Sequence, residues 1–170
     1  MLKIRRAELL DIDGIMPIIY NAQKYLAAQD IDQWQNSFPN ENVIKNDIQN
    51  AEAYVICDGE TLAAYFAFFT PPEPAYKNIE NGRWLIDTEN YCAMHHVAVS
   101  GDYRGRGLAH MIYKKCEERA REGGFDSLRV DTHEDNKIMR HTAEANGFVY
   151  CGVVYYNENM KRIAFEKSLL

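Results

Sequence analysis

Three glycines stand close together between a short apolar run and an amphipathic run. The apolar run is Val97-Ala98-Val99, the glycines are Gly101, Gly105 and Gly107, and the amphipathic run begins at Leu108. Glycine lets the backbone turn sharply and approach a ligand closely. The N–H groups that a helix leaves unpaired in its first turn point outward and bind anions. The order strand, glycine turn, helix therefore predicts a site for phosphate groups.

Length and composition limit the classes of protein to which the chain can belong. It has 170 residues, of which 46% are hydrophobic, which predicts one domain over residues 1–170. It contains no leader pattern and no apolar run long enough to span a bilayer. We therefore expect a soluble cytoplasmic protein with no membrane partner. Without CxxC spacing, we expect reduced thiols and no bound metal; the cysteines are Cys57, Cys92, Cys116 and Cys151.

The formal net charge of -6 argues against nucleic acid as a partner. Nucleic-acid affinity depends mainly on clustered lysine and arginine. Arg104 and Arg106 nevertheless make a small basic spot inside the glycine turn. An acidic chain with one small basic region predicts an anionic cofactor together with a substrate that is not anionic.

Hydrophobic periodicity divides the chain into alternating strands and helices. We expect an edge strand over residues 2–7, followed by helices capped by Asp11 and Asn40. Asp58-Gly59 predicts a hairpin turn. The prolines that follow predict a long loop or a broken short strand up to residue 90. The other predicted elements are strands over 53–57, 61–69, 91–100, 127–132, 148–155 and 162–166 and helices over 108–122 and 136–146.

Two common phosphate-binding motifs do not fit the glycine turn. A nucleotide-triphosphate loop needs GxxxxGK followed by Ser or Thr, and no lysine stands at that place. A dinucleotide fingerprint needs GxGxxG, but His110 occupies the position of the third glycine. Both readings are therefore excluded.

A third motif does fit, and it carries a family resemblance. Arg104-Gly105-Arg106-Gly107-Leu108-Ala109 has the pattern Arg or Gln, two residues, Gly, one residue, then Gly or Ala. With Asn136 and the Asn146-Gly147-Phe148 turn, it resembles the GCN5-related N-acetyltransferase (GNAT) family over roughly residues 53–166. The resemblance implies an α/β fold whose mixed, mostly antiparallel sheet has about seven strands and about four helices. It also implies that this sheet is splayed at the cofactor site.

The resemblance further implies a cofactor and a reaction. The cofactor is acetyl-CoA, and the acetyl group passes directly to a primary amine of a small molecule or peptide. The backbone of Val97 and Val99 is expected to bind the pantetheine arm, and Asn136 the pantetheine or the far end of the cofactor. The pyrophosphate is expected on the amides of Arg104, Gly105, Arg106, Gly107, Leu108 and Ala109.

An amine must lose a proton before or during acyl transfer. A lysine-like amine has a pKa near about 10.4, so a histidine is the natural proton acceptor. By strand alternation His95 shares a face with Val97, and His96 faces the other way. Either histidine is alternatively a hydrogen-bonded interior residue. His133 and Glu89 are the other candidate bases.

The general acid is not identified, because the tyrosine common in the family four residues before the glycine is replaced by Ala143. This gap leaves open a non-catalytic acyl-CoA sensor, and a protein interaction module is a further alternative. Trp34 and Tyr91 are expected to line the substrate side. A homodimer through the C-terminal strands is an open expectation.

Overall fold

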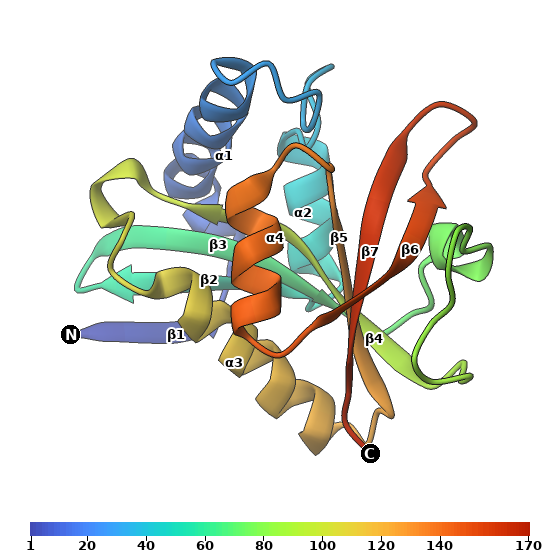
Figure 1. The fold of residues 1–170 in the computed structure, drawn as a ribbon. Coiled ribbons are helices and arrows are strands. Elements are labelled where there is room, and N and C mark those ends of the chain that lie inside the picture. Colours follow the sequence, from blue (N-terminus) through green and yellow to red (C-terminus); the bar gives the residue numbers. More distant parts are fainter. The chain divides into compact units, whose positions relative to one another are not determined.

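The chain forms a seven-stranded sheet and four α-helices. The computed structural model describes all residues from 1 to 170 (Figure 1). The strand order is β1-β2-β3-β4-β5-β7-β6, in which β4 and β5 run parallel while β1–β2, β2–β3, β5–β7 and β6–β7 run antiparallel. The mixed, mostly antiparallel α/β sheet predicted from the sequence is thereby confirmed. The elements are β1 (Leu2–Arg6), α1 (Ile12–Ala27), α2 (Glu41–Gln49), β2 (Ala53–Asp58), β3 (Thr61–Phe69), β4 (Tyr91–Val99), α3 (Leu108–Glu122), β5 (Ser127–Thr132), α4 (Lys137–Ala145), β6 (Val149–Tyr155) and β7 (Lys161–Ser168).

The chain divides into two compact units, and β4 contributes residues to both. The first unit holds residues 1–68 and 95–109, and the second holds residues 69–94 and 110–170. That residues 1–170 form one N-acetyltransferase domain stays a prediction. No helix in either unit is both long enough and apolar enough to cross a bilayer.

Local signals set the elements of the first unit. The Asn40 side chain accepts a hydrogen bond from the Val43 amide over 3.1 Å, which caps α2 as predicted. Gly59 has a φ of 63°, a left-handed conformation that a tight hairpin turn requires between β2 and β3. The start of α2 and the turn between β2 and β3 are therefore both fixed by residues next to them in sequence.

One apolar face of α1 builds the core of the first unit. Ile15, Met16 and Ile19 lie at helical spacing and are buried against the strands. Their partners include Val55 on β2 and Tyr65 on β3. Burial of such side chains contributes about 1.5 to 3 kcal/mol each, so this face holds α1 in place.

The second unit is built on the β6–β7 hairpin and its neighbour β5 (Figure 1). Asn136 caps α4, because its side chain accepts a hydrogen bond from the Met139 amide over 3.2 Å. The core of this unit gathers side chains from β4, β6, β7 and the segment before β4; they are Tyr76, Tyr91, Ala93, Val154 and Ala164. The segment from 70 to 90 therefore supplies core residues, although its sequence predicts a loop or a broken short strand.

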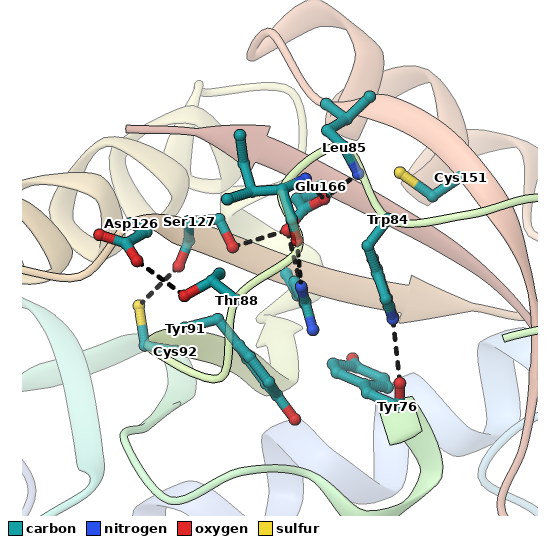
Figure 2. Close-up of polar contacts among 12 residues, drawn as sticks. Tyr76, Trp84, Leu85, Thr88, Tyr91, Cys92, Asp126, Ser127, Cys151 and Glu166 are labelled. Carbon is teal, nitrogen blue, oxygen red and sulfur yellow. Dashed lines mark hydrogen bonds and ion pairs between the residues drawn. The ribbon is translucent and has the colours of Figure 1, made fainter. Parts of the chain in front are cut away.

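A buried ion pair ties that segment to the sheet. Arg129 on β5 donates to Glu166 on β7 over 2.8 Å, and both side chains are almost fully buried. The Glu166 carboxylate also accepts from the Ser127 hydroxyl and from the amides of Leu85 and Ile86 (Figure 2). A buried carboxylate is tolerated only when such donors satisfy it.

Aromatic rings complete the surroundings of Arg129. Its guanidinium carbon lies 4.1 Å from the centroid of the Trp84 ring and 3.9 Å from that of Tyr91. Cation–π attraction of this kind strengthens when water is excluded. The segment before β4 is thus held by charge, hydrogen bonds and ring contacts together.

We predict that Glu166→Gln destabilises the protein by about 3 to 5 kcal/mol, because it leaves the Arg129 charge buried without its counter-ion. Urea unfolding followed by circular dichroism measures this. Glu118→Gln is the matched control, since Glu118 pairs with Lys115 over 3.2 Å on the surface and its loss should cost less than about 1 kcal/mol. Equal costs for the two variants would contradict the role assigned to the buried pair.

Candidate functional site

The turn between β4 and α3 adopts the backbone that its glycines allow. Gly105 has a φ of 74° and Gly107 a φ of 78°, both in the left-handed region. A Cβ built on either glycine meets no atom within 4 Å. The turn therefore presents bare backbone with open space in front of it, into which any side chain at these positions would project.

Two backbone amides of the turn donate hydrogen bonds within it, whereas those in the first turn of α3 have no partner inside the helix. The backbone amide of Arg104 donates to the carbonyl of Gly101 over 3.3 Å, and that of Arg106 donates to the carbonyl of Tyr103 over 3.4 Å. Both are long hydrogen bonds. The first-turn N–H groups of α3, beginning at Leu108, have no carbonyl to bond within the helix. Together with the dipole of this 15-residue helix they favour an anion at its start.

The two arginines of the turn lie against aromatic rings of the same unit. The Arg104 guanidinium lies 3.9 Å from the ring centroid of Tyr25 on α1, and that of Arg106 lies 4.9 Å from the ring of Tyr103. The Tyr103 hydroxyl in turn donates to Asp58 over 3.3 Å. These contacts hold both positive groups along the turn while leaving the residues exposed.

The pairing of β4 with β5 covers only the first residues of β4. The parallel ladder with β5 pairs Tyr91, Cys92 and Ala93 with residues 127–129 and ends there. It therefore does not use the backbone groups of Val97 and Val99, the two residues expected to bind pantetheine.

His96 interrupts the regular pleat of β4. Its φ of 54° lies in the left-handed region, which a strand residue other than glycine adopts only at an irregularity such as a bulge. Alternation counted from Val97 back to His95 passes through this residue. Strand alternation therefore no longer supports the inference that His95 and Val97 share a face.

His95 itself is half-buried at this point of the strand. Burial, with a smaller contribution from His96, lowers the pKa of His95 to about 3. The imidazole is thus neutral throughout the physiological range. A pKa so far below neutral is unfavourable for a general base, because efficiency is greatest near the working pH.

A buried carboxylate joins His96, and sequence reasoning missed it. Asp47 on α2 accepts hydrogen bonds at one oxygen from the Tyr65 hydroxyl and from His96 Nδ1, each over 2.7 Å. The sequence held one signal of this site. Asp47 continues the apolar spacing of Val43 and Ile44, and a charged residue on the buried stripe of a helix usually has a partner.

The other predicted residues divide between the two units. In the first, Trp34 packs against the core. In the second, His133 Nδ1 accepts from the Asp135 amide over 3.1 Å, and Glu89 is exposed. The hydroxyl of Tyr91 accepts from the Glu73 amide over 3.0 Å.

The position at which the family commonly carries a tyrosine supplies no proton donor. Ala143 is buried in α4. The side chain of Asn136, expected at the cofactor, is engaged as the cap of the same helix. No group of three or more His, Cys, Asp or Glu side chains is arranged to hold a metal ion.

Comparisons with known proteins agree with this architecture. The model of the acetyltransferase (GNAT) family matches residues 19–148. A GNAT-family acetyltransferase structure from Streptococcus agalactiae is 35% identical, with 99% of this chain and 96% of that chain covered and a TM-score of 0.90. No curated protein matches the chain.

More distant structures share the fold. A GNAT-family acetyltransferase from Listeria monocytogenes is 20% identical over 99% of this chain and 95% of that one, with a TM-score of 0.74. The ribosomal-protein-S18-alanine N-acetyltransferase from Escherichia coli is 14% identical over 99% and 94%, with a TM-score of 0.65. The glycine turn, the seven-stranded mixed sheet and the match over most of the chain lead to one conclusion: this protein belongs to the GNAT acetyltransferase family.

Proposed function

We propose that this protein transfers an acetyl group from acetyl-CoA directly to a primary amine of a small molecule or peptide. The observation that carries the proposal is the turn between β4 and α3, with its left-handed glycines and its helix start. The finer expectations from the sequence, a cytoplasmic location and a homodimer, stay predictions.

The turn fits the diphosphate of coenzyme A. Open space lies in front of Gly105 and Gly107, where a Cβ would otherwise stand. A diphosphate in that space gains charge-assisted hydrogen bonds from the amides at the start of α3, including those of Leu108 and Ala109. Arg104 and Arg106 add positive charge at the rim, and their own amides are the weaker donors because each already bonds within the turn.

The strand before the turn supports the rest of the cofactor in this proposal. An extended pantetheine arm can pair with the backbone of Val97 and Val99 as a further strand would. Asn136 is proposed to contact the cofactor through an atom other than the oxygen that caps α4. Trp34 and Tyr91 remain the proposed residues on the substrate side.

Direct transfer is favoured over a covalent enzyme intermediate. All four cysteines are buried. Burial raises the pKa of Cys92, the cysteine on β4, to about 12. A thiolate is therefore scarce at neutral pH, and a nucleophilic cysteine needs the opposite shift.

Proton removal from the amine falls to a group near the thioester. The sequence offers His95, His133 and Glu89, and each remains a proposal. His95 is neutral and can accept a hydrogen bond at any physiological pH, but its imidazolium form is disfavoured.

We predict that Gly107→Leu lowers the affinity for coenzyme A at least about 100-fold, because the new side chain fills the space proposed for the diphosphate. Isothermal titration calorimetry measures this affinity. Gly59→Leu is the matched control, since Gly59 has a similar φ of 63° and equally open surroundings in the β2–β3 turn. Both variants carry the same backbone strain of about 1 to 2 kcal/mol, so equal loss of affinity would reject the assignment of the turn.

We predict that the protein releases free coenzyme A thiol from acetyl-CoA in the presence of a primary amine. A thiol-reactive dye reports this release across polyamines, amino acids, aminoglycosides and peptide N-termini. An acyl-CoA sensor binds coenzyme A but releases no thiol with any amine. A protein interaction module binds no coenzyme A at all, so the two alternatives give different results.

We predict that protonation of His95 destabilises the fold in acid. In the unfolded chain His95 binds a proton below about pH 6.5, whereas in the folded protein it does so only below about pH 3. This contribution is complete above pH 6.5 and is lost as the pH falls, by up to about 1.4 kcal/mol per pH unit. Urea unfolding of His95→Gln between pH 7 and 5 should show a smaller loss than the wild type, whereas the exposed control His141→Gln should not.

A further inference from the structure

Three side chains of the first unit form a buried hydrogen-bonded cluster on β4, β3 and α2. The Asp47 carboxylate and the His96 ring have exposed side-chain fractions of only 5% and 11%. One carboxylate oxygen of Asp47 accepts from both the Tyr65 hydroxyl and His96 Nδ1 at 2.7 Å. Tyr65 is fully buried, so its hydroxyl directs Asp47 from a fixed position.

The cluster fixes the proton positions on the imidazole of His96. An ionised carboxylate only accepts hydrogen bonds, so the nitrogen that faces Asp47 carries a proton. In the neutral ring the lone pair is then on Nε2. A carboxylate behind a histidine in this way orients the ring and stabilises the imidazolium that forms when Nε2 takes a proton.

The backbone conformation of His96 is also unusual for a strand residue. Its left-handed φ is costly for a side-chain-bearing residue, and such conformations persist where surrounding contacts hold them, often at functional sites. The contact with Asp47 and an edge-on contact with the Phe38 ring, 5.5 Å between centroids, supply that support.

The charged and titratable neighbours of His96 come from α2 and the segment after it, from β3 and from β4 itself. Asp47 lies on α2 and Glu52 follows that helix; burial and Asp47 raise the pKa of Glu52, whereas His96 lowers it. His95, beside it on β4, stays neutral at working pH because its pKa is about 3. Tyr65 on β3 also stays neutral, since burial and Asp47 raise its pKa.

We propose that His96, in place of His95, His133 or Glu89, is the catalytic proton acceptor of the acetyl transfer, and that Asp47, held by Tyr65, is its positioning residue. This inference rests on the proposed function. His96 directly precedes Val97, the residue proposed to contact the pantetheine arm, and the proposal therefore puts its imidazole near the thioester.

The step balances with these residues. The amine nitrogen forms a bond to the acetyl carbonyl carbon, and its excess proton passes to Nε2 of His96. The carbon–sulfur bond breaks and its electron pair leaves with the coenzyme A sulfur. The proton on His96 then passes to that thiolate or to water, which restores the neutral ring.

The decisive variants are His96→Gln, Asp47→Asn and Tyr65→Phe, assayed with acetyl-CoA and the best amine of the panel above. His96→Gln should lower kcat about 100- to 10,000-fold and leave coenzyme A affinity within threefold. Asp47→Asn should move the acidic limb of the kcat/KM profile to lower pH, because the imidazolium loses its counter-ion. Tyr65→Phe should move it to higher pH, because the carboxylate loses a competing donor.

A matched control separates catalysis from structure. Asn40→Ala removes the cap of the helix that carries Asp47 without touching the cluster. It should lower the melting temperature and leave the limb where it is. A cluster that serves only the fold would make Asp47→Asn and Tyr65→Phe behave like this control, which would overturn the inference.

The remaining outcomes are also informative. Wild-type turnover combined with unchanged kcat in His96→Gln overturns the inference alone. Absence of thiol release by the wild type with every amine overturns the proposed function itself. If His96→Gln does not fold, long-range nitrogen–proton NMR of the wild type decides: protonated Nε2 and unprotonated Nδ1 on neutral His96 would refute the proposal.

Discussion

The turn that joins β4 to α3 can form only where the backbone takes left-handed conformations at Gly105 and Gly107. This constraint has two effects. It brings the start of a 15-residue helix close to the end of an apolar strand through the turn over residues 100–107. It also keeps side chains away from the amides there, so that the partial positive charge of the helix start meets solvent directly. The chemistry proposed for the protein depends on this local geometry.

Buried charge organises the second unit in a different way. Glu166 receives donors from β5 and from the segment before β4, which has little regular structure of its own. A carboxylate with four satisfied bonds gives this segment one preferred arrangement, whereas apolar contacts alone tolerate several. The same segment supplies Glu89 and ends at Tyr91. Hydrogen bonding in the interior therefore determines how this segment leads into β4.

Sequence reasoning succeeded at two places where the signal and its effect lie close together along the chain, although the Asp11 side chain makes no cap hydrogen bond to α1. Asn40 and Asp58-Gly59 act within three residues of themselves, and the predicted helix start and hairpin turn are confirmed. It failed where the partner lies far away. Asp47 and His96 are 49 residues apart, and nothing in either neighbourhood names the other. The left-handed backbone at His96 also defeats alternation, which is the rule by which faces of a strand are read from sequence.

The stacked arginines of the turn affect how an anion reaches it. The chain carries a net charge of -6, yet Arg104 and Arg106 hold exposed guanidinium groups in fixed places beside the helix start. A diffusing polyanion is repelled by most of such a surface and attracted by one small region, which orients it before contact. Dissolved ions weaken this guidance, because the screening distance shortens from about 10 Å at 0.1 M to about 3 Å at 1 M. The rate at which the proposed anionic cofactor meets this region is therefore expected to depend on ionic strength.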